Sequence, residues 1–541
     1  MIVPEARLAT HEVENQPPGA GDRDLWADDV VLRDHAAGAD AAALSAFGAA
    51  LGREAARAAG RAANRHPPEA VLFDRAGRRL DEVRFHPAYH DLMRLGLEAG
   101  YAARPWQAGG GGHLTHAAMV YLLSEVEPGV CCPMTMSYAA VPALSADAGL
   151  AALWRPKLTA RAYDPAIAPV SAKSAATMGM AMTEKQGGSD LRGNSTRAEA
   201  TADGWRLTGH KWFCSAPMSD GFLTLAQAPG GLTCFLVPRW LGDGTRNRIH
   251  LLRLKDKLGN RANASAEIEY HGALAHPLGA EGAGVRTIIE MVHHTRLDTA
   301  MAPAGLMRAA LTEAVHWVIH RRAFQRRLID QPLMRALLAD LALEWEGATA
   351  LSFAVARAFD GEGEAPDAFA RAGVAVAKYL SNKRAPWVIA EAMEILGGQG
   401  YTEDTPLPML FRESPLNAIW EGSGNVICLD LLRTVARVPG AGAALEARLD
   451  AASGADPAYD AALAAHRARW PALPGEAEAR WFTESLGLLL AAAALIARAP
   501  APVAEAYIAT RLAPAGRGQS LGAIGTREAG ALLARLDPRL G

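Results

Sequence analysis

The sequence contains little cysteine. Its 541 residues include five cysteines, an odd number with no C-x-x-C pair among them. A disulfide framework and a cysteine-based zinc site are therefore unsupported. A reduced compartment suits such a chain, and we expect a cytoplasmic protein.

The chain also lacks a strong net charge and a long apolar run. Its formal charge is −3, so any nucleic-acid site would have to be a local basic patch. The first residues show no basic region followed by an apolar one, as a secretory signal would. The longest apolar helix that we predict, over residues 486–497, is about half as long as a bilayer span. We expect a soluble protein without a membrane partner, in which this helix is part of the core.

Several cofactor and metal motifs are missing. The sequence has no P-loop, no H-E-x-x-H and no G-x-G-x-x-G, so nucleotide hydrolysis, zinc proteolysis and a Rossmann cofactor site are unsupported. His293 and His294 are adjacent, but no carboxylate lies at a helical spacing that would complete a metal site. We predict no metal site, and expect these histidines to pack against neighbouring helices or lie on the surface.

Periodicity divides the sequence into four parts and predicts a mainly α fold with a central β domain. Half of the residues are hydrophobic, which provides a large core, and the length predicts two to four domains. Helical patterns predict an N-terminal domain over 1–173 with an irregular arm, a bundle over 284–438 and an extension over 439–541. Short β-rich segments separated by turn residues predict a β domain over 174–283.

Individual elements can also be predicted. The pattern favours one helix over 40–64, a hairpin over 71–85, and bundle helices over 285–291, 301–322, 332–360, 366–396 and 424–437. The first of these helices is expected to stop at the prolines that follow His66. Short connections between the long helices favour an antiparallel arrangement.

One carboxylate stands out in the stretch A-I-W-E-G-S-G-N over residues 418–425. Glu421 follows Trp420 and precedes two glycines, and an amphipathic helix begins directly afterwards. Apolar neighbours remove hydration from a carboxylate, which raises its pKa and makes it a better base near neutral pH. Ser423 and Asn425 lie where the helix would begin and could cap it or hold a polar ligand. On this stretch alone, support of the helix N-terminus is the favoured role for Glu421, because turn-then-helix junctions with acidic residues are common.

A second stretch, M-G-M-A-M-T-E-K-Q-G-G-S-D over residues 178–190, favours a flat cofactor. The hydroxyl of Thr183 could meet a polar ring atom while the methionines pack on a ring face. Gly188 allows close backbone approach, and Ser189 offers a donor toward a phosphate or ribityl oxygen. The segment H-K-W-F-C-S at 210–215 adds aromatic and small polar side chains on a neighbouring strand. Each segment alone is an ordinary strand end, but together they suit a flat, partly polar cofactor.

The order of these motifs resembles the acyl-CoA dehydrogenase superfamily. The sequence contains, in order, M-T-E-x-x-G-G-S-D, K-W-F-x-S, D-K-L-G-x-R, R-x-x-F, G-G-x-G-Y and W-E-G-S. The variants E-K-Q-G-G-S-D, K-D-K-L-G-N-R-x-N-A-S, Q-P-L-M-R and W-E-G-S-G-N resemble its AidB-like, alkylation-response branch. The likeness covers nearly all of residues 72–433.

The resemblance implies a fold and a cofactor. The fold would have an N-terminal helical domain, a β-barrel-like middle domain and a C-terminal helical bundle, followed here by an extra helical tail. FAD would lie between the middle domain and the bundle. The implied FAD contacts are Met182, Thr183, Gly188, Ser189, Phe213, Cys214, Ser215, Arg321, Phe324, Gly397, Gly398, Ile419, Trp420, Gly422, Ser423 and Asn425.

The resemblance also implies an assembly. In a family homotetramer, Arg321, Phe324 and the G-G-x-G-Y loop at 397–401 would approach the FAD of a neighbouring subunit. One departure from the family pattern is Gln325, which stands where the usual R-x-x-F-G has glycine. The geometry of that loop therefore stays open.

By the same resemblance, Glu421 matches the catalytic base of an FAD-dependent oxidoreductase acting on CH–CH groups. It would remove the α-proton of an acyl-CoA thioester while the β-hydride passes to the flavin, a role worth about 10²–10⁴ in rate. Some relatives carry the base before the arginine of the first bundle helix. That position is Thr295 here, before Arg296, a predicted substrate contact, so no carboxylate competes. The implied electron acceptor is an electron-transferring flavoprotein.

Two functional classes remain open on the sequence. The chain could be a metabolic acyl-CoA dehydrogenase, or an AidB-like protein that binds duplex DNA through its extension during the response to alkylation damage. From residue 441 the extension has ten arginines and ten acids, although six arginines face three acids from Arg498 onward. Arg433 and Arg437 at the junction are the predicted nucleic-acid contacts. The alternative, that the arginines lie on solvated helix faces and pair with nearby acids, is equally supported.

Overall fold

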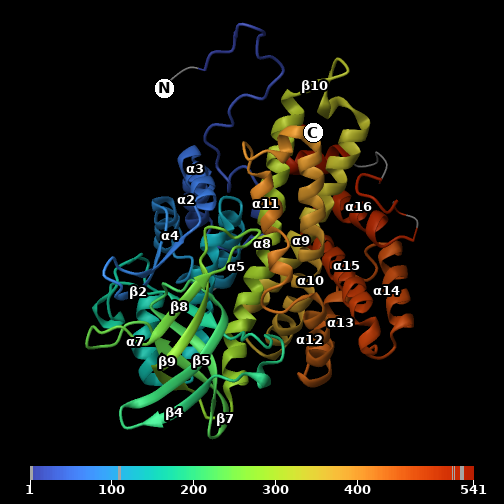
Figure 1. The fold of residues 1–541 in the computed structure, drawn as a ribbon. Coiled ribbons are helices and arrows are strands. Elements are labelled where there is room, and N and C mark those ends of the chain that lie inside the picture. Colours follow the sequence, from blue (N-terminus) through green and yellow to red (C-terminus); the bar gives the residue numbers. More distant parts are fainter. Residues whose placement is uncertain (1–3, 108–110, 515, 517, 524–528, 541) are drawn as a thin grey trace.

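The computed structural model describes residues 4–107, 111–514, 516, 518–523 and 529–540 (Figure 1). N-terminal helices and a β domain lie along one side of a long helical bundle. The C-terminal extension, drawn in red, lies against the other side of the bundle. The predicted class, mainly α with a central β domain, is confirmed.

In its described residues, the N-terminal part has an irregular arm followed by helices and a hairpin. Its helices are α1 Val30–His35, α2 Ala41–Gly52, α3 Glu54–Arg65, α4 Pro87–Ala99, α5 Gly112–Ser124, α6 Cys131–Leu144 and α7 Ala148–Leu158. The predicted hairpin is confirmed as β1 Glu69–Phe73 paired antiparallel with β2 Arg79–Arg84. The single helix predicted over 40–64 is wrong, because Arg53 is extended with ψ 139°. Gly52 there packs so closely on the Arg23 carbonyl that a Cβ would lie 2.1 Å from its oxygen.

The middle part is a mixed sheet of seven strands. They are β3 Met178–Ala181, β4 Arg197–Thr201, β5 Gly204–Ser215, β6 Gly221–Ala228, β7 Gly231–Pro238, β8 Ile249–Leu254 and β9 Ser265–Leu278. The order is β3-β6-β4-β5-β9-β7, and β6 also pairs with β7, so five strands close into a ring. Alternating residues of these strands fill the interior, among them Leu207, Phe222, Phe235, Ile268 and Tyr270.

The bundle is built from long helices. They are α8 Gly284–His320, α9 Pro332–Phe359, α10 Glu364–Ile395, α11 Leu407–Glu413 and α12 Gly424–Arg437. The prediction of two helices over 285–291 and 301–322 is wrong, since α8 is continuous. The polar residues between them are buried against partners: Asp298 accepts hydrogen bonds from Thr135 and Tyr101 and pairs with His116 at 2.7 Å. His293 stacks on Phe359 with ring centroids 4.5 Å apart, the packing role predicted for it.

The described residues of the extension form five α-helices: α13 Ala441–Asp450, α14 Pro457–Arg469, α15 Ala479–Arg498, α16 Ala501–Arg511 and α17 Ala529–Leu536. One helical segment, Glu476–Arg498, is long and apolar enough to cross a membrane by length and composition alone. Most of it is buried inside the structure, where α15 packs against α9 and α10. The predicted core helix over 486–497 is therefore confirmed.

Candidate active site

Glu421 has an unusual backbone conformation. It precedes α12 with φ at +56°, in the left-handed region that non-glycine residues seldom adopt. Two buried cations hold the chain on either side of it. Arg296 Nε donates to the Glu421 carbonyl at 3.1 Å, and Lys378 Nζ donates to the carbonyls of Gly422 at 3.0 Å and Asn417 at 2.7 Å. These contacts fix the turn in a conformation that costs energy on its own.

The carboxylate of Glu421 points to α8. Thr295 Oγ1 donates to Oε2 at 2.8 Å, and Oε1 accepts no hydrogen bond from any described residue. Burial raises the pKa of Glu421, and Thr295, Arg296 and Lys378 offset only part of that rise. A base with a raised pKa and one unoccupied oxygen is suited to accept a proton near neutral pH.

The alternative role for Glu421, support of the α12 N-terminus, is not what its contacts show. Its side chain bonds to Thr295 of α8 and not to the N–H groups of α12. Ser423 is the N-cap residue of α12, and its hydroxyl makes no capping hydrogen bond. Asn425 in the first turn accepts a hydrogen bond from Arg480 of α15 at 2.9 Å. The start of α12 therefore keeps unoccupied donors beside the Glu421 turn.

The guanidinium group of Arg296 is itself held by an ion pair. Its NH1 lies 2.6 Å from Asp430 Oδ2 on α12, and Arg371 of α10 approaches the same carboxylate at 3.3 Å. Burial alone would raise the pKa of Asp430, but the two guanidinium groups outweigh burial and lower the pKa below its ordinary value. Asp430 therefore stays ionised. Arg296 thus orients the backbone of the base, and its predicted contact with substrate stays a prediction.

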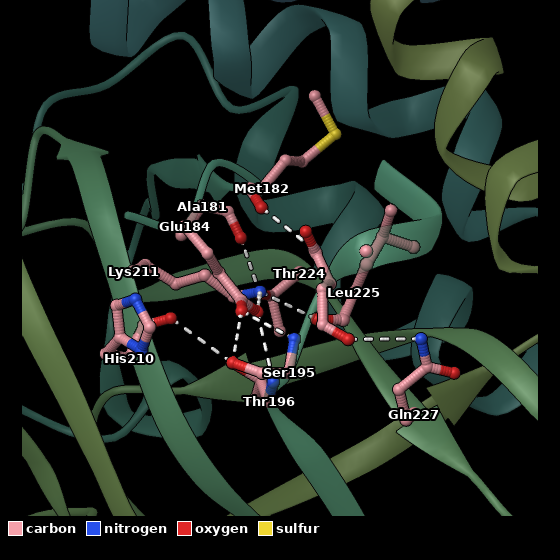
Figure 2. A network of polar contacts seen from close by, with 12 residues as sticks. Ala181, Met182, Glu184, Ser195, Thr196, His210, Lys211, Thr224, Leu225 and Gln227 are labelled. Carbon is pink, nitrogen blue, oxygen red and sulfur yellow. Dashed lines mark hydrogen bonds and ion pairs between the residues drawn. The ribbon is translucent and has the colours of Figure 1, made fainter. Parts of the chain in front are cut away.

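The β-domain side of the site rests on a buried ion pair (Figure 2). Lys211 Nζ donates to Glu184 Oε1 at 2.8 Å, and both side chains are inaccessible to solvent. Glu184 also accepts hydrogen bonds from Ser195 N, Ser195 Oγ, Thr196 N and Gln186 Nε2. Burial raises the pKa of Glu184, but Lys211 and these donors outweigh it and hold the pKa well below its usual range. The pair fixes the turn that carries Thr183 and Gly188.

The surface above this pair has the features of a cofactor cradle. The Thr183 hydroxyl makes no hydrogen bond within the described chain, and the Phe213 ring is 47% exposed. A Cβ on Gly188 would lie 2.5 Å from Thr183 Oγ1, so only glycine leaves that hydroxyl accessible. Ser189 is exposed, and Met182 and Ser215 are partly exposed. An open ring face with unoccupied hydroxyls fits an isoalloxazine, which has a flat face and a polar edge.

The side chain of one predicted FAD contact does not lie in the cradle. Cys214 is fully buried in the core of the β domain, on the opposite side of β5 from Phe213. Its neighbours in the sequence face the cradle, because successive side chains of a strand point to opposite sides. The Cys214 thiol therefore packs in the core and does not line the cradle.

Cys132, which sequence reasoning missed, links the cradle to the base. Burial raises the pKa of its thiol to about 12, and its environment includes Glu421, Asn263 and Ser215. Ser215 is the last residue of β5, and Cys132 lies in the first turn of α6. Cys132 therefore feels the charge of Glu421 as well as the side chain of Ser215 at the end of the cradle. In the segment before Glu421, Ile419 is 63% exposed and Trp420 partly exposed.

The remaining predicted FAD contacts lie at the opposite end of α8. Arg321, Gly397 and Gly398 line a separate pocket of about 460 Å³. Arg321 follows Thr295 by 26 residues of helix, which corresponds to about 39 Å. Phe324 is 91% exposed nearby, in the turn between β10 Arg322–Ala323 and β11 Arg326–Arg327. Within one chain these residues cannot reach the cradle.

Gln325 shows why the family has glycine at that position. Its φ is +65°, and Phe324 before it has φ +49°. Two successive non-glycine residues in the left-handed region strain the turn.

Lys378 is the main functional side chain that the sequence analysis overlooked. It is a single lysine in the apolar run A-G-V-A-V-A-K-Y-L of α10. Burial, more than the nearby Arg296, lowers its pKa to about 7. A lone cation in an otherwise apolar helical stretch is the signal that would have found it.

The basic residues of the extension are mostly paired. Arg433 and Arg437 are exposed on α12. Five arginines further along contact acids, namely Arg467, Arg469, Arg511, Arg535 and Arg539. Arg517 and Arg527 lie outside the described residues. The pairing alternative weighed from the sequence therefore describes much of the extension.

Comparison with known proteins identifies relatives along most of the chain. Three family models match: the adaptive response protein AidB N-terminal domain over 15–165, the acyl-CoA dehydrogenase middle domain over 179–273 and the acyl-CoA dehydrogenase C-terminal domain over 282–436. The putative acyl-CoA dehydrogenase AidB of Escherichia coli K12 is 43% identical over 92% of this chain and 94% of its own. Acyl-CoA dehydrogenase family member 11 of Caenorhabditis elegans is 33% identical over 69% of this chain and 63% of its own.

Solved structures agree with the fold. The C. elegans protein ACDH-11 in complex with C11-CoA superposes with a TM-score of 0.84, at 28% identity over 94% of both chains. The apo-form of Bd2924 superposes with a TM-score of 0.80, at 30% identity over 88% of this chain and 98% of its own. The arrangement of helical domain, β domain, bundle and extension is thus shared with whole relatives.

Proposed function

The chain belongs to the AidB branch of the FAD-dependent acyl-CoA dehydrogenase family, and from that premise we propose that it oxidises an acyl-CoA thioester between its α and β carbons. The observation that carries this proposal is the Glu421 turn, in which a carboxylate with a raised pKa is held in place by Arg296, Lys378 and Thr295. A positioned base is the one protein group that such an oxidation requires.

The residues of the site have separate roles in this reaction. Glu421 takes the α-proton on Oε1, since Thr295 occupies Oε2. Arg296 and Lys378 keep the base in place through backbone carbonyls, so the carboxylate need not reorganise during proton transfer. FAD, when bound, supplies the acceptor for the hydride that leaves the β carbon. Thr183, Ser189, Phe213, Ser215 and Ser423 would hold it.

The substrate class and partners are part of the proposal. The relative solved with C11-CoA supports an acyl thioester as ligand. We further propose a homotetramer, because Arg321, Phe324 and the glycine loop at 397–398 lie too far from the cradle of their own chain to serve it. An electron-transferring flavoprotein would reoxidise the enzyme in the cytoplasm.

The test uses purified protein loaded with FAD. Anaerobic addition of acyl-CoAs of graded chain length should bleach the flavin absorbance for at least one length. Dithionite should bleach the Glu421→Gln variant, whereas acyl-CoA should not. A folded protein that takes up no FAD, or flavin that no acyl-CoA reduces, would refute the proposal.

A second candidate function is duplex DNA binding in an alkylation response. The match to the adaptive response protein AidB N-terminal domain and the exposed Arg433 and Arg437 favour it. We propose weak, sequence-independent binding by this exposed face of α12. Affinity that depends on phosphate contacts should fall steeply with added salt.

Matched double variants test the DNA proposal. Arg433→Ala with Arg437→Ala should reduce the slope of log affinity against log salt by about 2. Arg467→Ala with Arg469→Ala removes the same charge from arginines that already pair with acids, and should change the slope less. Absence of duplex retardation at low salt and micromolar protein would leave only the dehydrogenase function.

A further inference from the structure

A second cavity lies behind the wall that carries Cys132 and Ser215. It has a volume of about 130 Å³ and is bounded by β2, α4, the segment over 163–167 and the turns that follow β5 and β7. Pro133 and Ala216, the neighbours of Cys132 and Ser215, form its near side. Most of the wall is aromatic or apolar, contributed by Val83, Phe85, Tyr89, Met93, Tyr163 and Ile167. An enclosed space of this size accepts a molecule about as large as benzene.

Two hydrogen-bond donors in this wall have no partner within the described chain. Ser219 is 2% exposed and its Oγ is unsatisfied, and Trp240 Nε1 is likewise buried and unsatisfied. Buried polar atoms in native proteins are nearly always satisfied, so each such group requires an explanation. Because both residues line the cavity, an acceptor atom inside it would satisfy both.

The third polar group in the wall is a buried cation. Arg239 is 6% exposed and donates to the carbonyls of Pro217 at 2.7 Å and Asp81 at 2.8 Å, but it forms no ion pair with a described residue. Burial lowers the pKa of Arg239 to about 10, so it remains charged at neutral pH. A buried charge without a counter-ion is unfavourable.

The other charged groups around the cavity are already satisfied. Lys173 pairs with Asp220 at 2.6 Å, which cancels both charges. Asp164 at the rim accepts hydrogen bonds from Ala166 N on one oxygen and from Ser174 on the other. The lining therefore has two cations, Lys173 and Arg239, and two carboxylates, Asp220 and Asp164 at the rim, and of the two cations it is Arg239 that forms no ion pair with a described residue.

We propose that this cavity binds a small organic carboxylate, about the size of benzoate. Its oxygens would accept hydrogen bonds from Ser219 and Trp240 beside the Arg239 guanidinium, and its apolar body would pack on the aromatic wall. The site is separate from the Glu421 turn, and the proposal does not depend on dehydrogenase activity.

Calorimetric titration of the FAD-loaded full chain with sodium benzoate tests it, with benzyl alcohol as a neutral analogue of similar shape. Benzoate should bind at one site per chain and benzyl alcohol at least tenfold more weakly. Ser219→Ala removes one donor and should weaken benzoate about tenfold. Ser145→Ala, an exposed serine outside the cavity, should leave benzoate affinity unchanged.

A second variant keeps the test decisive if Ser219→Ala folds poorly. Ala166 is exposed in the rim segment, and Ala166→Trp should obstruct the mouth without disturbing the core, so benzoate binding should fall by at least tenfold. No binding of benzoate at 10 mM, equal binding of benzyl alcohol, or benzoate affinity unchanged in both variants would each overturn the proposal.

Discussion

The buried ion pair under the cofactor cradle allows an asymmetric prediction. Breaking a buried pair costs about 3–5 kcal/mol, because one charge is left without its partner. In Lys211→Met, the Glu184 carboxylate keeps four hydrogen bonds, from Gln186, Ser195 and Thr196. In Glu184→Gln, the Lys211 ammonium loses its anionic partner and keeps the Leu225 carbonyl as its close acceptor. We therefore expect Lys211→Met to lower the free energy of unfolding of the β domain by about 3 kcal/mol, and Glu184→Gln to lower it by about 5 kcal/mol.

The pH dependence distinguishes the two variants further. In Glu184→Gln the lysine can fold only after releasing its proton, which costs about 5 kcal/mol at pH 7 from an ordinary pKa. The unfolded state then binds one proton more than the folded state, so stability should rise by about 1.4 kcal/mol per pH unit up to pH 9. In the wild type, the depressed pKa of Glu184 gives a rise of the same sign but in the acid range: its contribution to stability is full above about pH 4.5 and is lost at lower pH.

The assay is native-state hydrogen exchange of β-domain amides, because a chain of several domains has no single free energy of unfolding. The double variant Glu184→Gln with Lys211→Met should cost less than the sum of the single variants. Arg467→Met, which breaks the exposed pair with Glu446, is the control and should cost under about 1 kcal/mol. A larger loss in Lys211→Met than in Glu184→Gln, or additive losses, would refute the reasoning.

Three further predictions concern the active site. Glu421→Gln should lower flavin reduction by acyl-CoA by at least about 10² while FAD stays bound, measured by stopped-flow absorbance. In the wild type, the rate of flavin reduction should fall as the pH falls through the raised pKa of Glu421. Because the Lys378 charge lowers that pKa, Lys378→Met should shift this pH–rate profile to higher pH with FAD retained. An unshifted profile would limit Lys378 to a structural role. Gly188→Ala places a methyl group 2.5 Å from Thr183 Oγ1 and should weaken FAD at least tenfold in a fluorescence titration, whereas Gly193→Ala, which meets open space, should not.

The sequence predicted features that depend on local patterns. The hairpin over 71–85, the strands of the middle part and the helix over 424–437 follow from periodicity and turn residues, and the structure confirms them. The continuity of α8 could not be predicted, because its polar centre looks like a break until Asp298 is seen to be buried against His116 and Thr135. Tertiary contacts there override local propensity.

The sequence predicted the residue types of the base and of the cofactor contacts, but not the residues that hold the base in place. Glu421, Thr183 and Gly188 stand in motifs with a chemical reason for each residue. Lys378 acts through backbone carbonyls, and Cys132 approaches Glu421 only because α6 and the α12 turn meet in space. Contacts of that kind leave no spacing rule in the sequence.

The extension shows why counting charges could not decide its role. Arg511 is buried against Asp340 and Glu344 of α9, and Arg535 pairs with Glu346 at 2.7 Å. Two of the six arginines from Arg498 onward therefore attach the extension to the bundle. Removing the extension would take the Arg511 and Arg535 partners away from buried acids of α9, which is destabilising. Loss of DNA binding in such a truncation would report a damaged fold, so the informative substitutions are those at Arg433 and Arg437.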